Sequence, residues 1–317
     1  MEDNQEAITE TNEIVGVEKK VKPVFWQRIA AFIIDKFIVI GIPAWLSGFL
    51  LSTLYYRMGA YGALLGLLIF TLYFGLMNSC LCKGQTLGKK LMRIKVVNSI
   101  GEYLTVSKSL LRAFILGVGV VGFFSVGAVK LTVLYSLPVI LLALISAVTL
   151  TAIVTLFLFN VKNRQSWHDF AAESFVVKNN DENDLAESKP SKIAIDFSIL
   201  FSIAIIVMSS FQFVHMKRVM APATLLIKEI QSKTYIPVTA FSFKVTNTGN
   251  PTYTMVAVGL RTENIRNEEL MDETAAMLQR QKFNGKKIDY AIVTLIRNYD
   301  IGITRNYLKN TKEYKFD

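Results

Sequence analysis

The sequence predicts an α-helical integral membrane bundle of about five transmembrane helices, followed by a small α+β soluble domain. Hydrophobic residues make up 52% of the 317 residues and charged residues 19%, whereas soluble domains average about 45–50% and about 25%. The apolar residues also gather in long runs, and a segment of mixed helix and strand character follows the last run. This unevenness excludes a disordered chain, a collagen-like repeat and an ordinary soluble enzyme.

The N-terminal part begins with a polar tail and continues into two predicted spans. Residues 1–24 are polar and lack the basic start and apolar core of a signal peptide, so they predict a disordered cytoplasmic tail. Residues 25–56 predict one long helix, kinked at Pro43 because proline removes a backbone hydrogen bond. Residues 59–82 predict the second span.

Three further spans follow. The apolar stretch 111–159 is long enough for about two crossings and is interrupted by Lys130, so it predicts a helical hairpin over 109–129 and 131–159. The spans with their loops form a predicted membrane domain over 25–178. An acidic linker, 179–192, then leads into a fifth span over 193–214.

Loop charge orients these spans. The loop 83–108 carries six basic residues against one acidic residue, and basic residues also precede the first span and follow the fourth. The positive-inside rule therefore predicts a cytoplasmic N-terminus. Alternation then places the C-terminal domain outside the cytoplasm. The charges around the fifth span favour the reverse, and an odd number of crossings in 111–159 would make the tail cytoplasmic.

The C-terminal region 215–317 predicts a soluble α+β domain. The expected elements are helices near 221–232 and 267–282 and strands at 235–246, 252–260, 290–297 and 301–307. Its 16 Lys+Arg exceed its 10 Asp+Glu, which allows contact with anionic lipid, although an ordinary solvated basic surface explains the excess more simply. Because topology accounts for the basic loops, we expect no nucleic-acid partner.

The charges inside the first predicted span are the leading site candidates. Arg28 and Asp35 are seven residues apart, so they share a helix face about 10 Å apart along the axis. A charge within a span is costly, so Asp35 is expected to find a basic partner, a polar cavity or a proton. A packing ion pair and an ion or proton site are the two alternatives. Lys36 points elsewhere and is expected to snorkel toward the cytoplasmic surface.

The loop segment GQTLGKKLMRIKVV is the second candidate. Its motif residues are Gly84, Thr86, Gly88, Lys89, Lys90 and Arg93. Leu87, Leu91 and Ile94 recur at helical spacing, which predicts an amphipathic helix in the headgroup plane with the basic residues off its apolar stripe. Binding of anionic lipid and simple topology-setting charge are both consistent with this pattern.

Several strings resemble cofactor or catalytic motifs without their context. Residues 84–90 lack the length and the Ser/Thr of a P-loop, and the GxGxxG string 117–122 lies in an apolar run. His168 and Asp169 are adjacent near Ser166, but no nucleophile elbow accompanies them; His168 is instead expected to titrate between about pH 5 and about pH 8. The sequence predicts no enzyme, cofactor or metal site.

These segments together resemble the RDD family of bacterial membrane proteins over about residues 23–178. The resemblance rests on Arg28 through Asp35, the loop GQTLGKKLMRIKVV, Arg112, and RQSWHDFAAESFVV with its Asp169. It implies that Arg28, Asp35 and Asp169 are the family's naming arginine and aspartates. Where the family often has a second acid beside the first-span aspartate, this chain has Lys36.

The resemblance implies a multi-pass protein of the bacterial inner (plasma) membrane and suggests transport, including cation/proton exchange. The first hypothesis is therefore that the bundle moves a small solute or ion by means of Asp35. The second is a non-transporting scaffold or adaptor that displays the C-terminal domain to a protein partner or to a second copy of itself.

Overall fold

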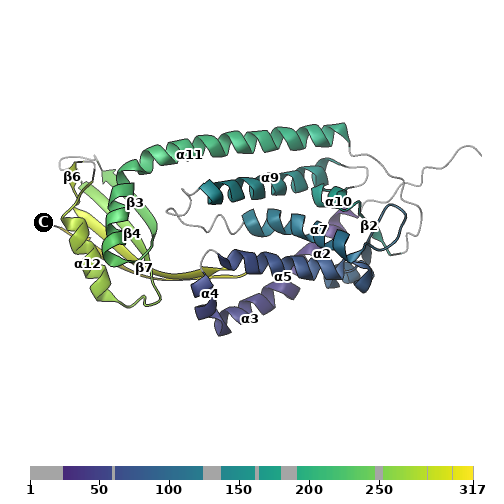
Figure 1. Cartoon of the computed structure of the whole chain (residues 1–317), viewed down its shortest axis with the longest axis horizontal. Coiled ribbons are helices and arrows are strands. Elements are labelled where there is room, and N and C mark those ends of the chain that lie inside the picture. Colours follow the sequence, from purple (N-terminus) through teal and green to yellow (C-terminus); the bar gives the residue numbers. More distant parts are fainter. Residues whose placement is uncertain are drawn as a thin grey trace, which may run out of the picture.

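The computed structural model describes residues 24–58, 61–123, 137–160, 164–179, 191–246, 253–283, 285–301 and 303–316. Figure 1 shows a helical bundle with the C-terminal domain at one end and the short elements α6, β1, β2 and α10 at the other. We call the second of these the loop end. Most of the predicted N-terminal tail and acidic linker lies outside the described residues.

The first predicted span consists of three helical segments in succession. The α-helix α2 (Phe25–Ile34) continues as a π-helix, η1 (Asp35–Gly41), and then as α3 (Ile42–Leu50). The π-helical turns end just before Pro43, whose missing N–H removes one bond of the regular α-helical ladder. The helix then breaks at Leu51 before α4 (Ser52–Met58), so the single long helix that we predicted is interrupted.

The middle of the bundle contains three tightly packed helices. They are α5 (Gly62–Met77), α7 (Val106–Gly117) with its π-helical continuation η4 (Val118–Gly122), and α9 (Leu137–Phe159). A Cβ on Gly117 would lie 2.7 Å from Leu67 Cδ1, and one on Gly119 would lie 3.1 Å from Ile153 Cδ1. The glycines of the GxGxxG string thus allow close helix packing. Residue 130, the predicted turn, lies outside the described residues.

Short elements close the loop end of the bundle. They are the 3-10 turn η3 (Cys80–Cys82), α6 (Leu87–Leu91), β1 (Ile94–Val97), α10 (Trp167–Ala171) and β2 (Phe175–Lys178). Strands β1 and β2 pair antiparallel, with Ile94 opposite Lys178. The predicted amphipathic helix is therefore wrong beyond Leu91: Arg93 adopts a φ of 57°, and the buried Ile94 starts a strand.

Helix α11 (Lys192–Thr234) links the bundle to the C-terminal domain. Its 43 residues give a length of about 65 Å, so the fifth predicted span and the next predicted helix form one continuous helix. Among the described residues, three helices are long and apolar enough to cross a membrane: Phe25–Leu50, Leu141–Phe159 and Lys192–His215. Helices α4 and α5, which are bent by 110°, can make a fourth, and the count of about five is not confirmed.

The C-terminal domain is a four-stranded sheet covered by helices. Its strands are β3 (Val238–Thr246), β4 (Tyr253–Arg261), β7 (Tyr290–Asp300) and β8 (Arg305–Lys315), in that spatial order. Strands β4 and β7 are parallel and are joined through α12 (Glu268–Gln279) and the small hairpin β5 (Lys282–Phe283) and β6 (Lys286–Lys287). Residues of α12 and of the end of α11 cover one face. The last strand begins at Arg305, later than predicted.

The tip of the β7–β8 hairpin contacts the bundle at the end opposite the loop end (Figure 1). The rings of Tyr299 and Tyr55 lie 5.4 Å apart, and Ile301 is fully buried beside them. Arg261 donates a hydrogen bond to the carbonyl of Tyr56 over 2.6 Å. The domain is therefore held to the bundle by this hairpin as well as by α11.

Candidate functional site

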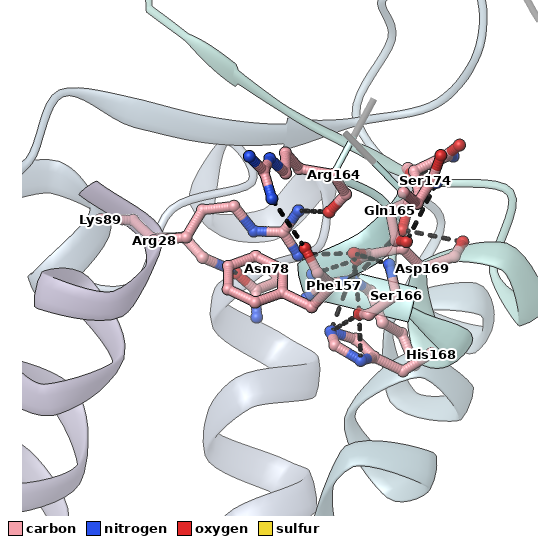
Figure 2. A network of polar contacts seen from close by, with 12 residues as sticks. Arg28, Asn78, Lys89, Phe157, Arg164, Gln165, Ser166, His168, Asp169 and Ser174 are labelled. Carbon is pink, nitrogen blue, oxygen red and sulfur yellow. Dashed lines mark hydrogen bonds and ion pairs between the residues drawn. The ribbon is translucent and has the colours of Figure 1, made fainter. Parts of the chain in front are cut away.

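Asp169 is the centre of a buried ion-pair cluster at the loop end (Figure 2). Its side chain is fully buried and accepts from Arg28 Nη2 at 2.5 Å and from Arg112 Nη2 at 2.6 Å. Arg28 comes from α2 and Arg112 from α7, so one carboxylate of α10 joins three elements. Removing any one of these three buried charged groups would leave another buried charge without its partner, which is strongly destabilising.

Local structure around α10 fixes the orientation of Asp169. Ser166 and Asp169 form a capping box, in which the Ser166 amide donates to Asp169 Oδ2 over 3.1 Å. The Arg28 guanidinium lies over the Phe157 ring, 4.9 Å from its centroid, and also donates to the carbonyl of Arg164. The short helix thus presents its acid to the two arginines in a single geometry.

Burial and charge set the protonation states on α10. Burial by itself would raise the pKa of Asp169, but the charges of Arg28 and Arg112 outweigh it and hold that pKa well below its usual value. Burial lowers the pKa of His168 to about 3, with Asp169 opposing the shift and Arg112 reinforcing it. Our expectation that His168 titrates near neutral pH is therefore wrong, because burial keeps its imidazole neutral in that range.

Asp35 forms a second cluster, separate from the first. Its carboxylate is fully buried and accepts hydrogen bonds from the Tyr73 hydroxyl at 2.8 Å, the Thr86 hydroxyl at 2.5 Å and the Gly88 amide at 2.8 Å. Thr86 is also the N-cap of α6, accepting from the Lys89 amide. Asp35 thereby ties the start of η1 to α5 and α6.

Gly88 permits this contact between α6 and α2. A Cβ at this position would lie 2.2 Å from the Ala31 carbonyl oxygen and 2.9 Å from Asp35 Oδ2. Any larger residue would push α6 away from the first helix. The glycine is therefore needed for close backbone approach rather than for cradling a phosphate.

Lys89 is buried between the two clusters. Only 8% of the residue is exposed, and among the described residues its ammonium has one hydrogen-bond partner, Asn78 Oδ1. Burial, with the positive charges of Arg112 and Arg28, lowers its pKa well below the usual value, while Asp35 and Asp169 act in the opposite direction. A lysine with so few partners is costly to keep charged in the absence of a counter-ion.

A cavity of about 350 Å³ lies against these charges. We call it the loop-end cavity. Its walls are apolar and come from α2, α5, α7, η4, α9 and β2, and its polar lining comprises Arg28, Asp35, Lys89, Arg112, Ser166 and His168. It is thus an apolar space with a charged end.

A second cavity of about 340 Å³ lies on the side of the C-terminal domain. We call it the hairpin cavity, because Asp300 and Arg305 of the β7–β8 hairpin line it. Residues of η4 and of η1, including Lys36, form other parts of its wall. Val120 of η4 lines both cavities and is only 8% exposed. Lys36 lines this cavity on the side of the C-terminal domain, whereas we expected it to snorkel toward the cytoplasmic surface, which the positive-inside rule predicts on the side of the loop 83–108.

Comparison with known proteins places the membrane bundle in a family. Residues 22–173 match the model of the RDD family, and this stretch includes both charge clusters. The membrane domain belongs to the RDD family. The C-terminal region lies outside the match. A search of curated proteins and a search of solved structures each gave no match to the chain.

Within the RDD domain, the residues singled out from the sequence divide into groups. Arg28, Arg112, His168 and Asp169 lie together around α10, whereas Asp35 lies with Thr86 and Gly88. Asp35 therefore pairs with hydroxyl and amide donors rather than with Arg28, although both line the loop-end cavity. Gly84 adopts a φ of 66°, and Lys90 and Arg93 are exposed.

Sequence reasoning missed two polar partners in the RDD domain. Tyr73 and Asn78 both fall inside the apolar run predicted as the second span, and they contact Asp35 and Lys89. A signal was available, because a polar side chain near the end of a span must meet a partner or the interface. The sequence alone could not indicate which charge each would meet.

Proposed function

We propose that the RDD domain transports a small solute or ion across the membrane, using the two cavities as the halves of its pathway. The observation that carries this proposal is that the loop-end cavity and the hairpin cavity are both lined by Val120. Pathways of alternating access need a site near the middle of the bundle that each side can reach in turn. Val120 is the barrier between the two sides.

The π-helical segments support a barrier at this level. Segment η1 carries Asp35 on the loop-end cavity and Lys36 on the hairpin cavity, and η4 carries Val120. Such π-turns are frequent at functional sites and break the regular helical ladder. The barrier therefore lies beside two π-helical segments of the described bundle.

Asp35 is the coupling group of this proposal. A proton on its carboxylate would turn one of the accepting carboxylate oxygens into a donor. The hydroxyls of Tyr73 and Thr86 and the amide of Gly88 would then compete for fewer accepting lone pairs. Protonation would thus loosen α6 from η1 and open the loop-end cavity. A bound cation would have to displace the same three donors, which disfavours exchange of a metal cation at this carboxylate.

Flux in vesicles tests the proposal. The full chain is reconstituted into vesicles that contain a pH-sensitive dye, and gradients of sodium, chloride and an alkyl sulfonate are imposed in turn. We expect at least one gradient to move protons faster than in empty vesicles, and we expect Asp35→Asn and Val120→Trp to abolish that flux. Ile145→Trp, at an exposed position of α9, should leave it intact. Flux equal to that of empty vesicles under every gradient would reject transport.

A second candidate function is display of the C-terminal domain to a partner protein. The packing of the β7–β8 hairpin on the bundle favours it, because Tyr299 and Ile301 fix the orientation of the sheet relative to the bundle. Chemical cross-linking of the full chain in membranes should then recover a partner through residues 217–317. Recovery that persists after this region is deleted would count against display.

A further inference from the structure

The loop-end cavity reaches the outer surface of the bundle on one side. Val154 and Leu158 line it and are 44% and 45% exposed on α9, a candidate membrane span. What surrounds such a helix in a membrane is lipid, so the cavity meets the acyl chains there. The remaining wall is formed by apolar side chains such as Phe25, Phe32 and Leu150. A hydrocarbon chain could enter from the bilayer without crossing water.

The charged end of the same cavity has an excess of positive charge. Arg28, Arg112 and a protonated Lys89 carry three positive charges against the two negative charges of Asp169 and Asp35, which leaves one positive charge uncompensated. Asp35 uses its oxygens for Tyr73, Thr86 and Gly88, and no ion pair among the described residues joins it to Lys89. The best remaining partner of a protonated Lys89 is therefore an anion in the cavity.

We propose that the loop-end cavity binds an amphipathic anion, with its charged head against Lys89, Arg28 and Arg112 and its apolar tail between α2 and α9. The proposal rests on the proposed transport function and names the chemical class of its solute. A cavity of about 350 Å³ is at the small end of the range for ligand pockets. It fits one hydrocarbon chain better than a whole two-chain lipid.

Binding of decanesulfonate to the full chain in dodecyl maltoside micelles tests the head-group contact. Its head keeps one negative charge at all accessible pH values, and calorimetry gives the dissociation constant. We expect Lys89→Met to weaken binding about tenfold or more, because a charge-assisted contact is lost. Lys90→Met is the matched control, since Lys90 is the next residue in α6 and is exposed; it should bind like the wild type.

A second set of binding measurements tests the contact with the apolar tail. Val154→Trp should fill the opening on α9 and weaken binding, whereas Ile145→Trp, exposed on the same helix and away from the cavity, should not. Methanesulfonate, which is a head without a tail, should bind at least about a hundredfold more weakly, because it buries almost no apolar surface.

The anion is either a bilayer lipid or a free alkyl acid, and a measurement of the lipid that stays bound to the protein distinguishes the two. The protein is released from nanodiscs of phosphatidylcholine with phosphatidylglycerol, and the retained lipid is measured by mass spectrometry. Phosphatidylglycerol enriched on the wild type and on Lys90→Met but not on Lys89→Met identifies a lipid. Decanesulfonate binding without such enrichment identifies a free acid.

Equal decanesulfonate affinity in wild type and Lys89→Met would overturn the proposal, and so would equal affinity for methanesulfonate and decanesulfonate. These outcomes differ from failure of the proposed function. Decanesulfonate binding that depends on Lys89, combined with no flux in vesicles, would reject transport and keep the site. Flux of a simple inorganic ion without decanesulfonate binding would keep transport and reject the site.

Discussion

Neutralising Asp169 is expected to destabilise the RDD domain strongly. The carboxylate is fully buried, and the side chains of Arg28 and Arg112 are only 9% and 5% exposed. Asp169→Asn keeps the size of the side chain but leaves two buried guanidinium groups without their counter-charge. Breaking a buried ion pair in this way costs about 3–5 kcal/mol, which lowers the folding equilibrium constant by about two to four orders of magnitude.

Unfolding in mixed micelles measures this cost. The fraction of dodecyl sulfate is raised in dodecyl maltoside at neutral pH, and loss of helix is followed by circular dichroism. Glu173→Gln is the control, because Glu173 pairs with Lys108 at 2.5 Å while both side chains are exposed; we expect no measurable change there. If Asp169→Asn unfolds at the same detergent fraction as the control, the cluster does not hold the helices together and the reasoning is refuted.

Three further predictions follow from the geometry. Gly88→Ala should lower the unfolding midpoint in the same assay, because the new Cβ would lie 2.2 Å from the Ala31 oxygen; an unchanged midpoint would show that α6 is free to shift. The pKa of His168 is lowered to about 3, so the unfolded chain binds the extra proton first and stability should fall as the pH drops below about 6.5. His168→Gln should flatten that fall, and an unaltered pH profile would contradict this assignment. Topology reporters placed at residue 317 and in the loop 83–108 should report opposite compartments, whereas activity from one compartment at both positions would reject the proposed orientation.

The sequence was sufficient where a pattern acts locally. Long apolar runs predicted helices α2, α5 and α9, and β-branched segments bounded by turn residues predicted β3, β4 and β7. Local patterns failed where the chain changes conformation within a few residues. Lys89 was expected on an exposed helix face, but α6 is only five residues long and Arg93 turns the chain into β1 at a positive φ. That change carries Ile94 into the core, whereas the contacts of Thr86 and Gly88 with Asp35 hold α6, and with it Lys89, against the bundle.

The partners of the charges could not be predicted for a different reason. Arg28 and Asp169 are 141 residues apart, and Asp35 and Gly88 are 53 apart. Helical spacing placed Arg28 and Asp35 on one face, which is consistent with both lining the loop-end cavity. Which donor each charge meets depends on how α6 and α10 pack against the bundle. No local pattern in a single sequence predicts that packing.

Proton uptake on ligand binding tests the central role of Lys89 most directly. Burial, Arg112 and Arg28 lower the pKa of Lys89 in the empty cavity, and a bound anion raises it again, so binding should take up a proton above the lowered pKa. The charged and titratable groups that face Lys89 are Arg28, Asp35, Arg112, His168 and Asp169. Of the residues on α10, Asp169 stays ionised and His168 stays neutral above neutral pH.

Calorimetry of decanesulfonate binding in two buffers of different ionisation enthalpy counts the protons exchanged. The account predicts uptake of up to about one proton by the wild type and by Lys90→Met at a pH between the lowered and the ordinary pKa of Lys89, and none by Lys89→Met. Binding without proton uptake by the wild type, or with the same uptake by Lys89→Met, would contradict it.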